Sequence, residues 1–76
     1  MPTLIRLTRS KVTMYAADHN PPHFHVLAND GVEAWVEIAS MQVIYGAVRP
    51  AVLREALTWA GANRSVLAEK WKELNS

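Results

Sequence analysis

Hydrophobic and polar positions change their spacing about two thirds of the way along the chain. Up to residue 45 the apolar residues come in short runs or at alternate positions, a pattern typical of strands. From residue 50 onward they recur at intervals of three, four and seven, as on one face of a helix. The pattern therefore predicts an α+β fold in which the strands come first and the helix last.

Five short segments are expected to form an antiparallel, meander-like sheet of four or five strands. They are residues 4–8, 12–15, 23–27, 32–38 and 41–45. Residues 16–22 contain two prolines, which cannot donate ladder hydrogen bonds, so a loop is expected there. We expect one domain over residues 1–76, with its strands within about residues 3–45.

The last third of the chain predicts a long helix over about residues 50–74, packed on one face of the sheet. Pro50 suits the first helical position. The apolar stripe consists of Leu53, Leu57, Ala60, Leu67, Trp71 and Leu74. Because the stripe stays in phase across Gly61, it favours one helix kinked there over two helices. A straight helix of this length would span about 37 Å and overhang a domain with a radius of gyration of about 11 Å. It would then bend, or dock its end on another molecule.

The turn at residues 29–31 determines which side chains face each other across the hairpin. A three-residue turn with a left-handed Gly31 collects apolar side chains on one face, whereas a two-residue turn mixes apolar and charged residues on both faces. The expected cross-strand pairs are Phe24 with Val36, Val26 with Ala34, His25 with Trp35 and His23 with Glu37. The face opposite the core would carry His23, His25, Glu33, Trp35 and Glu37, and no element of the chain is left to cover it.

Composition and charge exclude several kinds of chemistry and of binding partner. The chain of 76 residues has no cysteine, so disulfides and thiolate chemistry are excluded. Eight Lys and Arg against seven Asp and Glu give a net charge of +1, which does not support nucleic acid as a partner. No apolar run approaches the roughly 20 residues of a membrane span, and no secretory signal is evident. We expect a cytoplasmic protein without a membrane partner.

All three histidines of the chain, His19, His23 and His25, lie within seven residues of one another. Asp18 precedes them, and the hairpin register places Glu37 beside them. The proline pair between His19 and His23 stiffens the loop that leads into the strand. This segment carries the candidate functional site.

Three interpretations of the histidine segment remain open. In the first, His23, His25 and His19, with a carboxylate, hold a divalent transition-metal cofactor. In the second, His23 and His25 are a catalytic acid/base pair assisted by Asp18, His19 and Glu37, as ribonuclease-like cleavage requires. In the third, the residues form a hydrogen-bonded turn without catalysis.

Trp35 and Glu33 are candidates for a protein interface. Both are expected on the polar face of the sheet, and an exposed tryptophan flanked by charges is typical of contact surfaces. The alternative is that an edge of the helix covers Trp35. A second copy of the chain could bind there and form a homodimer.

The segment from Met14-Tyr15 through residues 18–26, together with Ala34-Trp35-Val36, Gly46 and Trp59, resembles the small bacterial domain-of-unknown-function family 4160. The resemblance implies a short bacterial protein often encoded beside a second small protein. It implies the partner-binding component of a toxin–antitoxin-like two-gene module, with the neighbouring gene's product or a second copy as partner. The alternative is a histidine-dependent ribonuclease or small metal-dependent hydrolase that uses His23 and His25. The family supplies no established catalytic residues.

Overall fold

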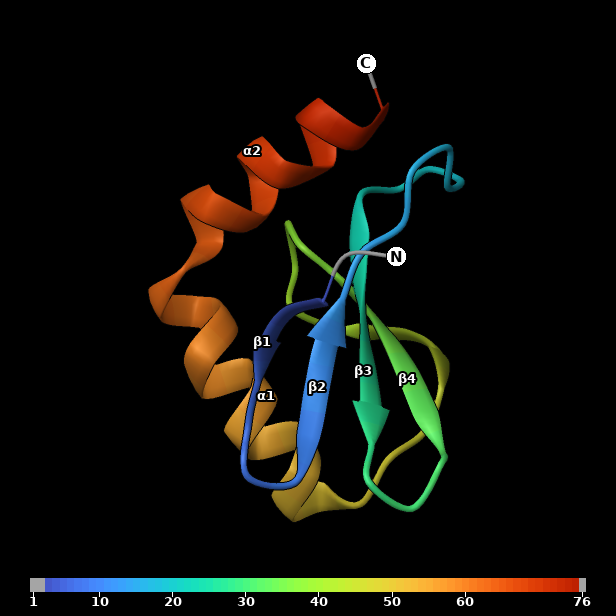
Figure 1. Ribbon diagram of the computed structural model, residues 1–76, viewed down its shortest axis with the longest axis vertical. Helices are drawn as coiled ribbons and strands as arrows, with labels where there is room; N and C mark the ends of the chain where they lie inside the picture. The colour runs from blue at the N-terminus through green and yellow to red at the C-terminus, as the bar shows by residue number, and fades with distance from the viewer. Residues whose placement is uncertain (1–2, 76) are drawn as a thin grey trace.

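Five antiparallel strands and two helices make up the computed structural model, which describes residues 3–75. The elements are β1 (Thr3–Arg6), β2 (Ser10–Thr13), β3 (His23–Ala28), β4 (Glu33–Glu37), β5 (Val43–Gly46), α1 (Pro50–Ala62) and α2 (Arg64–Asn75). The strands follow one another across the sheet in chain order, as a meander (Figure 1). The predicted α+β class and antiparallel sheet are confirmed. The radius of gyration, 11.1 Å, agrees with the expected value.

The hairpin between β3 and β4 has the predicted register. Phe24 pairs with Val36, Val26 with Ala34, His25 with Trp35 and His23 with Glu37. The turn closes through hydrogen bonds from the Ala28 N–H to the Val32 carbonyl and from the Gly31 N–H to the Ala28 carbonyl. Gly31 has the expected positive φ, 95°. The prediction of a three-residue turn is therefore correct, and the two histidines of β3 point away from the core.

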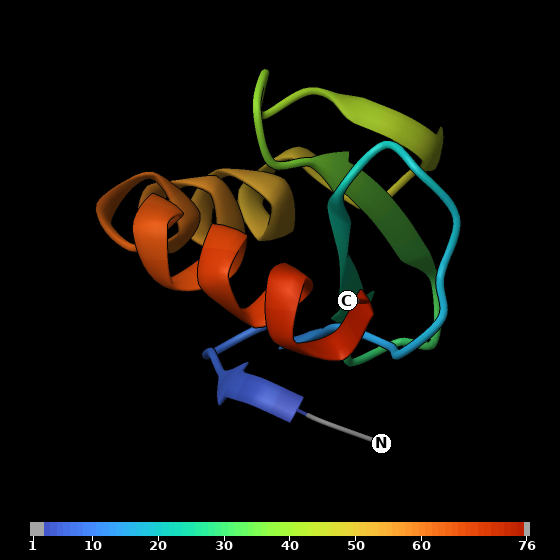
Figure 2. The ribbon, with the colours of Figure 1, turned by 90° about the horizontal axis from the view of Figure 1, so that it is seen from above.

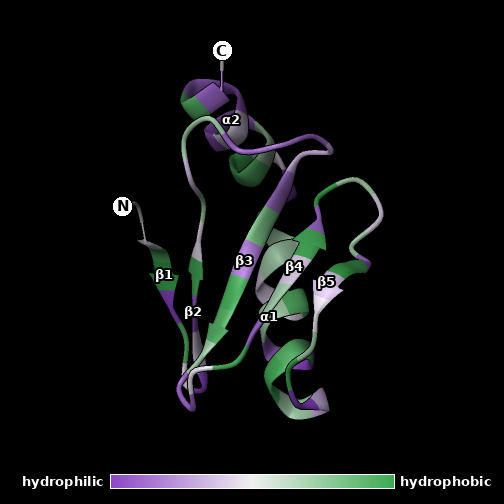
Figure 3. Cartoon of the chain, turned by 90° about the vertical axis from the view of Figure 1, so that its right-hand side faces the viewer, coloured by the Kyte–Doolittle hydropathy of each residue, from purple (hydrophilic) through white to green (hydrophobic). Residues whose placement is uncertain are grey.

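The core lies between one face of the sheet and the two helices. Its buried members are Val12, Met14, Phe24, Val26, Ala28, Val36, Ile38, Val52, Ala56, Ala60, Leu67 and Trp71. Helix α1 runs along this face, and α2 crosses the end of the sheet where β2 stops and β3 starts (Figures 1 and 3). Val32, expected as the first residue of the strand at 32–38, is 45% exposed because it belongs to the turn and precedes β4.

The expectation of one long helix kinked at Gly61 is wrong, because the helix ends at Ala62 and a second begins at Arg64. Asn63 leaves the helical conformation, with φ −127° and ψ 27°. Its side-chain amide donates to the Trp59 carbonyl over 2.8 Å, so its own side chain satisfies a carbonyl of the last turn. The break redirects α2 across the sheet (Figure 2). The longest extent of the molecule is 32 Å, less than the about 37 Å that a straight helix would span, because the chain turns between α1 and α2.

Within the described part of the chain, neither helix is long and apolar enough to cross a membrane.

Candidate functional site

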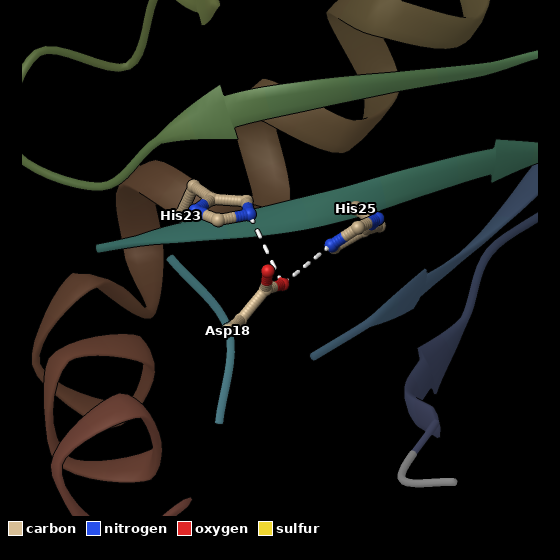
Figure 4. Close-up of side chains that lie close together, drawn as sticks. All are labelled: Asp18, His23 and His25. Atoms are coloured by element: carbon tan, nitrogen blue, oxygen red, sulfur yellow. Dashed lines mark hydrogen bonds and ion pairs between the residues drawn. The ribbon is translucent and has the colours of Figure 1, made fainter. Parts of the chain in front are cut away.

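The loop before β3 brings a carboxylate to two imidazoles on the sheet face opposite α1. Asp18 Oδ2 lies 3.1 Å from His25 Nε2 and 3.2 Å from His23 Nε2 (Figure 4). The two histidines share a face because they are two residues apart on β3. Asp18, His23 and His25 form the candidate site, which we call the Asp–His cluster.

The histidines of the Asp–His cluster are buried, which corrects the expectation of an uncovered face. His23 is 2% exposed and His25 is 6% exposed. Aromatic rings from β4, α2 and the loop after β2 cover them: Trp35 of β4 stacks on His23, Trp71 of α2 lies 5.3 Å from the same imidazole, and Tyr15 of the loop meets His25 edge-on. The single helix expected from the sequence covers only the core face, whereas α2 crosses the end of the sheet and brings Trp71 against His23.

The other nitrogen of each imidazole contacts an acceptor outside the cluster. His23 Nδ1 lies 2.8 Å from the Pro21 carbonyl oxygen, and His25 Nδ1 lies 3.2 Å from Glu33 Oε2. Glu33 also accepts a hydrogen bond from the Trp35 indole N–H. Since a carbonyl oxygen can only accept, His23 Nδ1 carries a proton and donates to Pro21. His25 has a carboxylate oxygen at hydrogen-bond distance from each ring nitrogen, because its Nε2 also lies 3.1 Å from Asp18 Oδ2. Both Nε2 atoms are thereby turned toward Asp18.

Asp18 forms hydrogen bonds through both its backbone N–H and its carboxylate. Its backbone N–H donates to Asn75 Oδ1 at the end of α2 over 2.9 Å, and its Oδ1 accepts from the His19 N–H. Burial raises the pKa of the Asp18 carboxyl, but the hydrogen bonds from His25 and the His19 backbone, with the charges of His23 and His25, outweigh it and lower the pKa below its usual value. Asp18 is therefore a carboxylate near neutral pH.

The remaining predicted site residues lie apart from the Asp–His cluster. His19 is exposed and reaches the site only through its backbone N–H. Glu37 pairs with His23 in the strand register, but its carboxylate accepts from the Ser40 hydroxyl. Trp35, expected to be exposed, is partly buried against His23. The structure thus brings Asp18, His23 and His25 together and leaves out His19 and Glu37.

Glu33, which the sequence suggested only for an interface, is the carboxylate that contacts His25. Its position is diagonal to His25 across the β3–β4 pair, since His25 lies opposite Trp35. Diagonal neighbours are within reach of a long side chain. The predicted register therefore brings two glutamates near the histidines, Glu37 opposite His23 and Glu33 diagonal to His25, and the one that contacts a histidine is Glu33.

Three ligand-type atoms of the cluster lie within 4.8 Å of one another, one from each residue. His23 Nε2 is buried and lacks a hydrogen-bond partner, because its 3.2 Å approach to Asp18 is not aligned as a hydrogen bond. Two imidazole nitrogens and one carboxylate are a donor set that divalent transition metals accept.

A family model described as "Domain of unknown function (DUF4160)" matches residues 10–72. The chain belongs to this family. The DUF4160 match extends from the start of β2 into α2 and contains the whole Asp–His cluster. It confirms the family suggested by the sequence motif. No curated protein and no solved structure matches the chain.

Proposed function

We propose that this DUF4160 protein is the partner-binding component of a toxin–antitoxin-like two-gene module in the cytoplasm, and that β5 contacts the partner. Among residues 3–75, five large hydrophobic side chains are exposed, and three of them are consecutive in β5: Val43, Ile44 and Tyr45. We call these three residues the β5 strip. Clustered exposed apolar side chains are typical of protein contact surfaces. This observation carries the proposal.

The β5 strip is suited to side-chain contact rather than to the addition of a further strand. β5 is an edge strand, and its pairing with β4 shifts register between Trp35 and Val36, so that Ile44 is the extra residue of a bulge. Bulges at a sheet edge disfavour pairing with another strand. The proposed partner is the small protein encoded by the neighbouring gene, and it would present an apolar surface to Ile44 and Tyr45.

Neither an exposed Trp35 nor a protruding end of a long helix supports this proposal. Trp35 packs against His23 and Tyr45, and the chain turns between α1 and α2 instead of continuing as one long helix. The β5 strip replaces them as the expected contact surface.

Co-expression with the neighbouring gene's product tests the proposal. We expect a complex that Ile44→Lys weakens at least tenfold, because the lysine charge would have to be desolvated in an apolar contact. Val66→Lys is the matched control, because Val66 is also exposed but lies on α2. Equal weakening by both substitutions, or no complex with the wild-type chain, would refute the proposal. A homodimer sensitive to Ile44→Lys would instead identify a second copy as the partner.

The Asp–His cluster favours a second candidate function, a histidine-dependent ribonuclease or small metal-dependent hydrolase. The supporting observation is the line of contacts from Asp18 through His25 to Glu33. RNA cleavage by the purified chain should then disappear in the double variant His23→Ala, His25→Ala and persist in His19→Ala. Cleavage that survives the double change would rule out the histidine mechanism.

A further inference from the structure

Three features of the Asp–His cluster favour the binding of a cation. The first is the proton arrangement. Because His23 donates from Nδ1 to the Pro21 carbonyl, a neutral His23 presents an Nε2 lone pair to the Asp18 carboxylate. A lone pair 3.2 Å from a carboxylate oxygen is repelled by it. A neutral His25 has one N–H for two carboxylates, Asp18 and Glu33, so one of its nitrogens meets the same repulsion. Only a proton or a metal ion on Nε2 removes the repulsion.

The second feature is burial. His23 is 2% exposed, and its Nε2 has no hydrogen-bond partner. Leaving a buried polar atom unpaired costs about 1–3 kcal/mol. A metal ion bound by Nε2 would satisfy this atom and the Asp18 carboxylate together.

The third feature is charge. Within residues 3–75, neither Asp18 nor Glu33 forms an ion pair with a lysine or arginine, so the histidines are their only basic neighbours at ion-pair distance. The two carboxyl groups therefore have no permanently charged cation beside them. A divalent ion bound at the cluster would supply that positive charge.

We propose that Asp18 Oδ2, His23 Nε2 and His25 Nε2 bind one divalent transition-metal ion. Two ligand atoms about 2.0–2.1 Å from a tetrahedral zinc ion lie about 3.3 Å from each other. The two Asp18–histidine distances, 3.1 and 3.2 Å, are close to that separation (Figure 4). Two imidazoles and one carboxylate favour zinc, iron, cobalt or nickel over magnesium or calcium, which prefer all-oxygen sites.

The surroundings also match those of metal sites. A histidine ligand usually donates its second N–H to a carboxylate or backbone carbonyl, which orients the ring and increases its basicity. Glu33 plays that part for His25 and the Pro21 carbonyl for His23. Asp18 additionally lines a surface hollow with Asn20, Trp71 and Asn75, through which water could complete the coordination. This inference is independent of partner binding, and it would supply the cofactor for the metal-dependent form of the second candidate function.

Metal titration of the full chain, freed of metal with a chelator, tests the inference without substrate or partner. We expect calorimetry to show one zinc ion per chain and cobalt to give the visible absorption of a low-coordinate nitrogen–oxygen site. Magnesium should give neither signal. Absence of saturable binding by both zinc and cobalt overturns the proposal.

Two variants and one control test the assignment to these residues. Glu33→Gln keeps every ligand but removes the carboxylate that contacts His25, and it should weaken zinc binding about 10–100-fold. His25→Ala removes a ligand and should weaken zinc binding at least as much. His19→Ala is the control, because this exposed histidine lies outside the cluster. Loss of binding in His19→Ala with wild-type affinity in the other two overturns the assignment.

Histidine nitrogen NMR gives a readout that does not depend on the stability of any variant. Zinc added to the wild-type chain should shift the Nε2 resonances of His23 and His25 and leave both Nδ1 protonated. Coordination through Nδ1, or a shift confined to His19, contradicts the proposed geometry.

Discussion

The imidazole of His23 stacks on the indole of Trp35, with ring centroids 5.2 Å apart and ring planes 19° from parallel. Trp71 lies against the same imidazole from α2, at 5.3 Å. These contacts connect the candidate site to both the sheet and the last helix. They also explain how a residue on the face opposite the core is buried as deeply as the core itself.

The three histidines should differ sharply in their reaction with diethyl pyrocarbonate. We expect His19 to be modified first, because it is exposed whereas His23 and His25 are buried. Peptide mass spectrometry of the partly modified protein measures each rate. Trp35→Ala should accelerate modification of His23 by removing its stacking partner.

Trp59→Ala is the control for that experiment, because Trp59 has no ring contact with either buried histidine in the described part of the chain. Similar rates for all three histidines in the wild-type protein would contradict the burial found here.

Leu67→Ala should lower the free energy of unfolding by about 2–5 kcal/mol, the usual cost of truncating a fully buried leucine. Leu67 has no exposed surface and joins α2 to the core. A chain of this size has a total stability of about 4–11 kcal/mol, so much of the fold's stability would be lost. Urea denaturation followed by circular dichroism measures the change.

The neighbouring Val66→Ala should change the same free energy by no more than about 0.5 kcal/mol, because Val66 is 54% exposed. Equal losses in the two variants would mean that α2 does not pack through Leu67.

Gly46→Ala should destabilise the protein by more than about 1 kcal/mol. Gly46 has a φ of 74°, and a Cβ atom there would overlap the Glu33 carbonyl oxygen. Gly61→Ala should raise the stability by up to about 1 kcal/mol, since Gly61 is helical and a Cβ meets nothing within 4 Å. Thermal unfolding distinguishes the two variants, because the melting temperature should fall in Gly46→Ala and rise in Gly61→Ala. A fall in both would place Gly61 in a tighter environment than the structure shows.

Glu55 should contribute stability that disappears in acid. The Arg9 backbone N–H donates to its carboxylate over 3.0 Å, and this bond, with the nearby Arg9 and Thr8, lowers the pKa of Glu55. A carboxyl whose folded pKa lies below its unfolded value stabilises the fold above the unfolded pKa, and the effect is lost as the pH falls through the folded pKa. Glu55→Gln should therefore be less stable than the wild-type protein at pH 7, and the difference should shrink below about pH 4.5.

Urea denaturation at pH 7 and pH 3 measures this difference. Glu69→Gln, at an exposed position on α2, should show little difference at either pH. A Glu55→Gln deficit that is unchanged between the two pH values would contradict the proposed role of the carboxylate.

The β3–β4 hairpin was predictable because two independent local signals agreed. The left-handed turn at Gly31 and the alternation of apolar residues each allow few registers, and they have one in common. The helix break was not predictable from periodicity, since the apolar stripe keeps its phase across Asn63. What ends α1 is a side-chain hydrogen bond from Asn63 to Trp59, which periodicity does not report.

The candidate site was predicted in part, for a similar reason. Strand alternation places His23 and His25 on one face, and their position beside Asp18 in the chain suggested a cluster. The choice between Glu33 and Glu37 depends on side-chain rotamers, and the burial of His23 depends on Trp71, far along the chain. Such contacts between distant segments become visible only when the fold is known.

The hydrogen bond from the Asp18 N–H to Asn75 joins residues that are 57 positions apart in the chain. All three side chains of the cluster fall within an eight-residue stretch, yet a synthetic peptide of residues 15–28 would lack Asn75, Trp71 and Trp35. Such a peptide would contain the sequence motif but would lack the residues that hold its three side chains in their positions. Unwinding of the last turn of α2 would likewise break the hydrogen bond between Asn75 and the Asp18 N–H. Local unfolding of this helix end and exposure of the two buried histidines should therefore occur together.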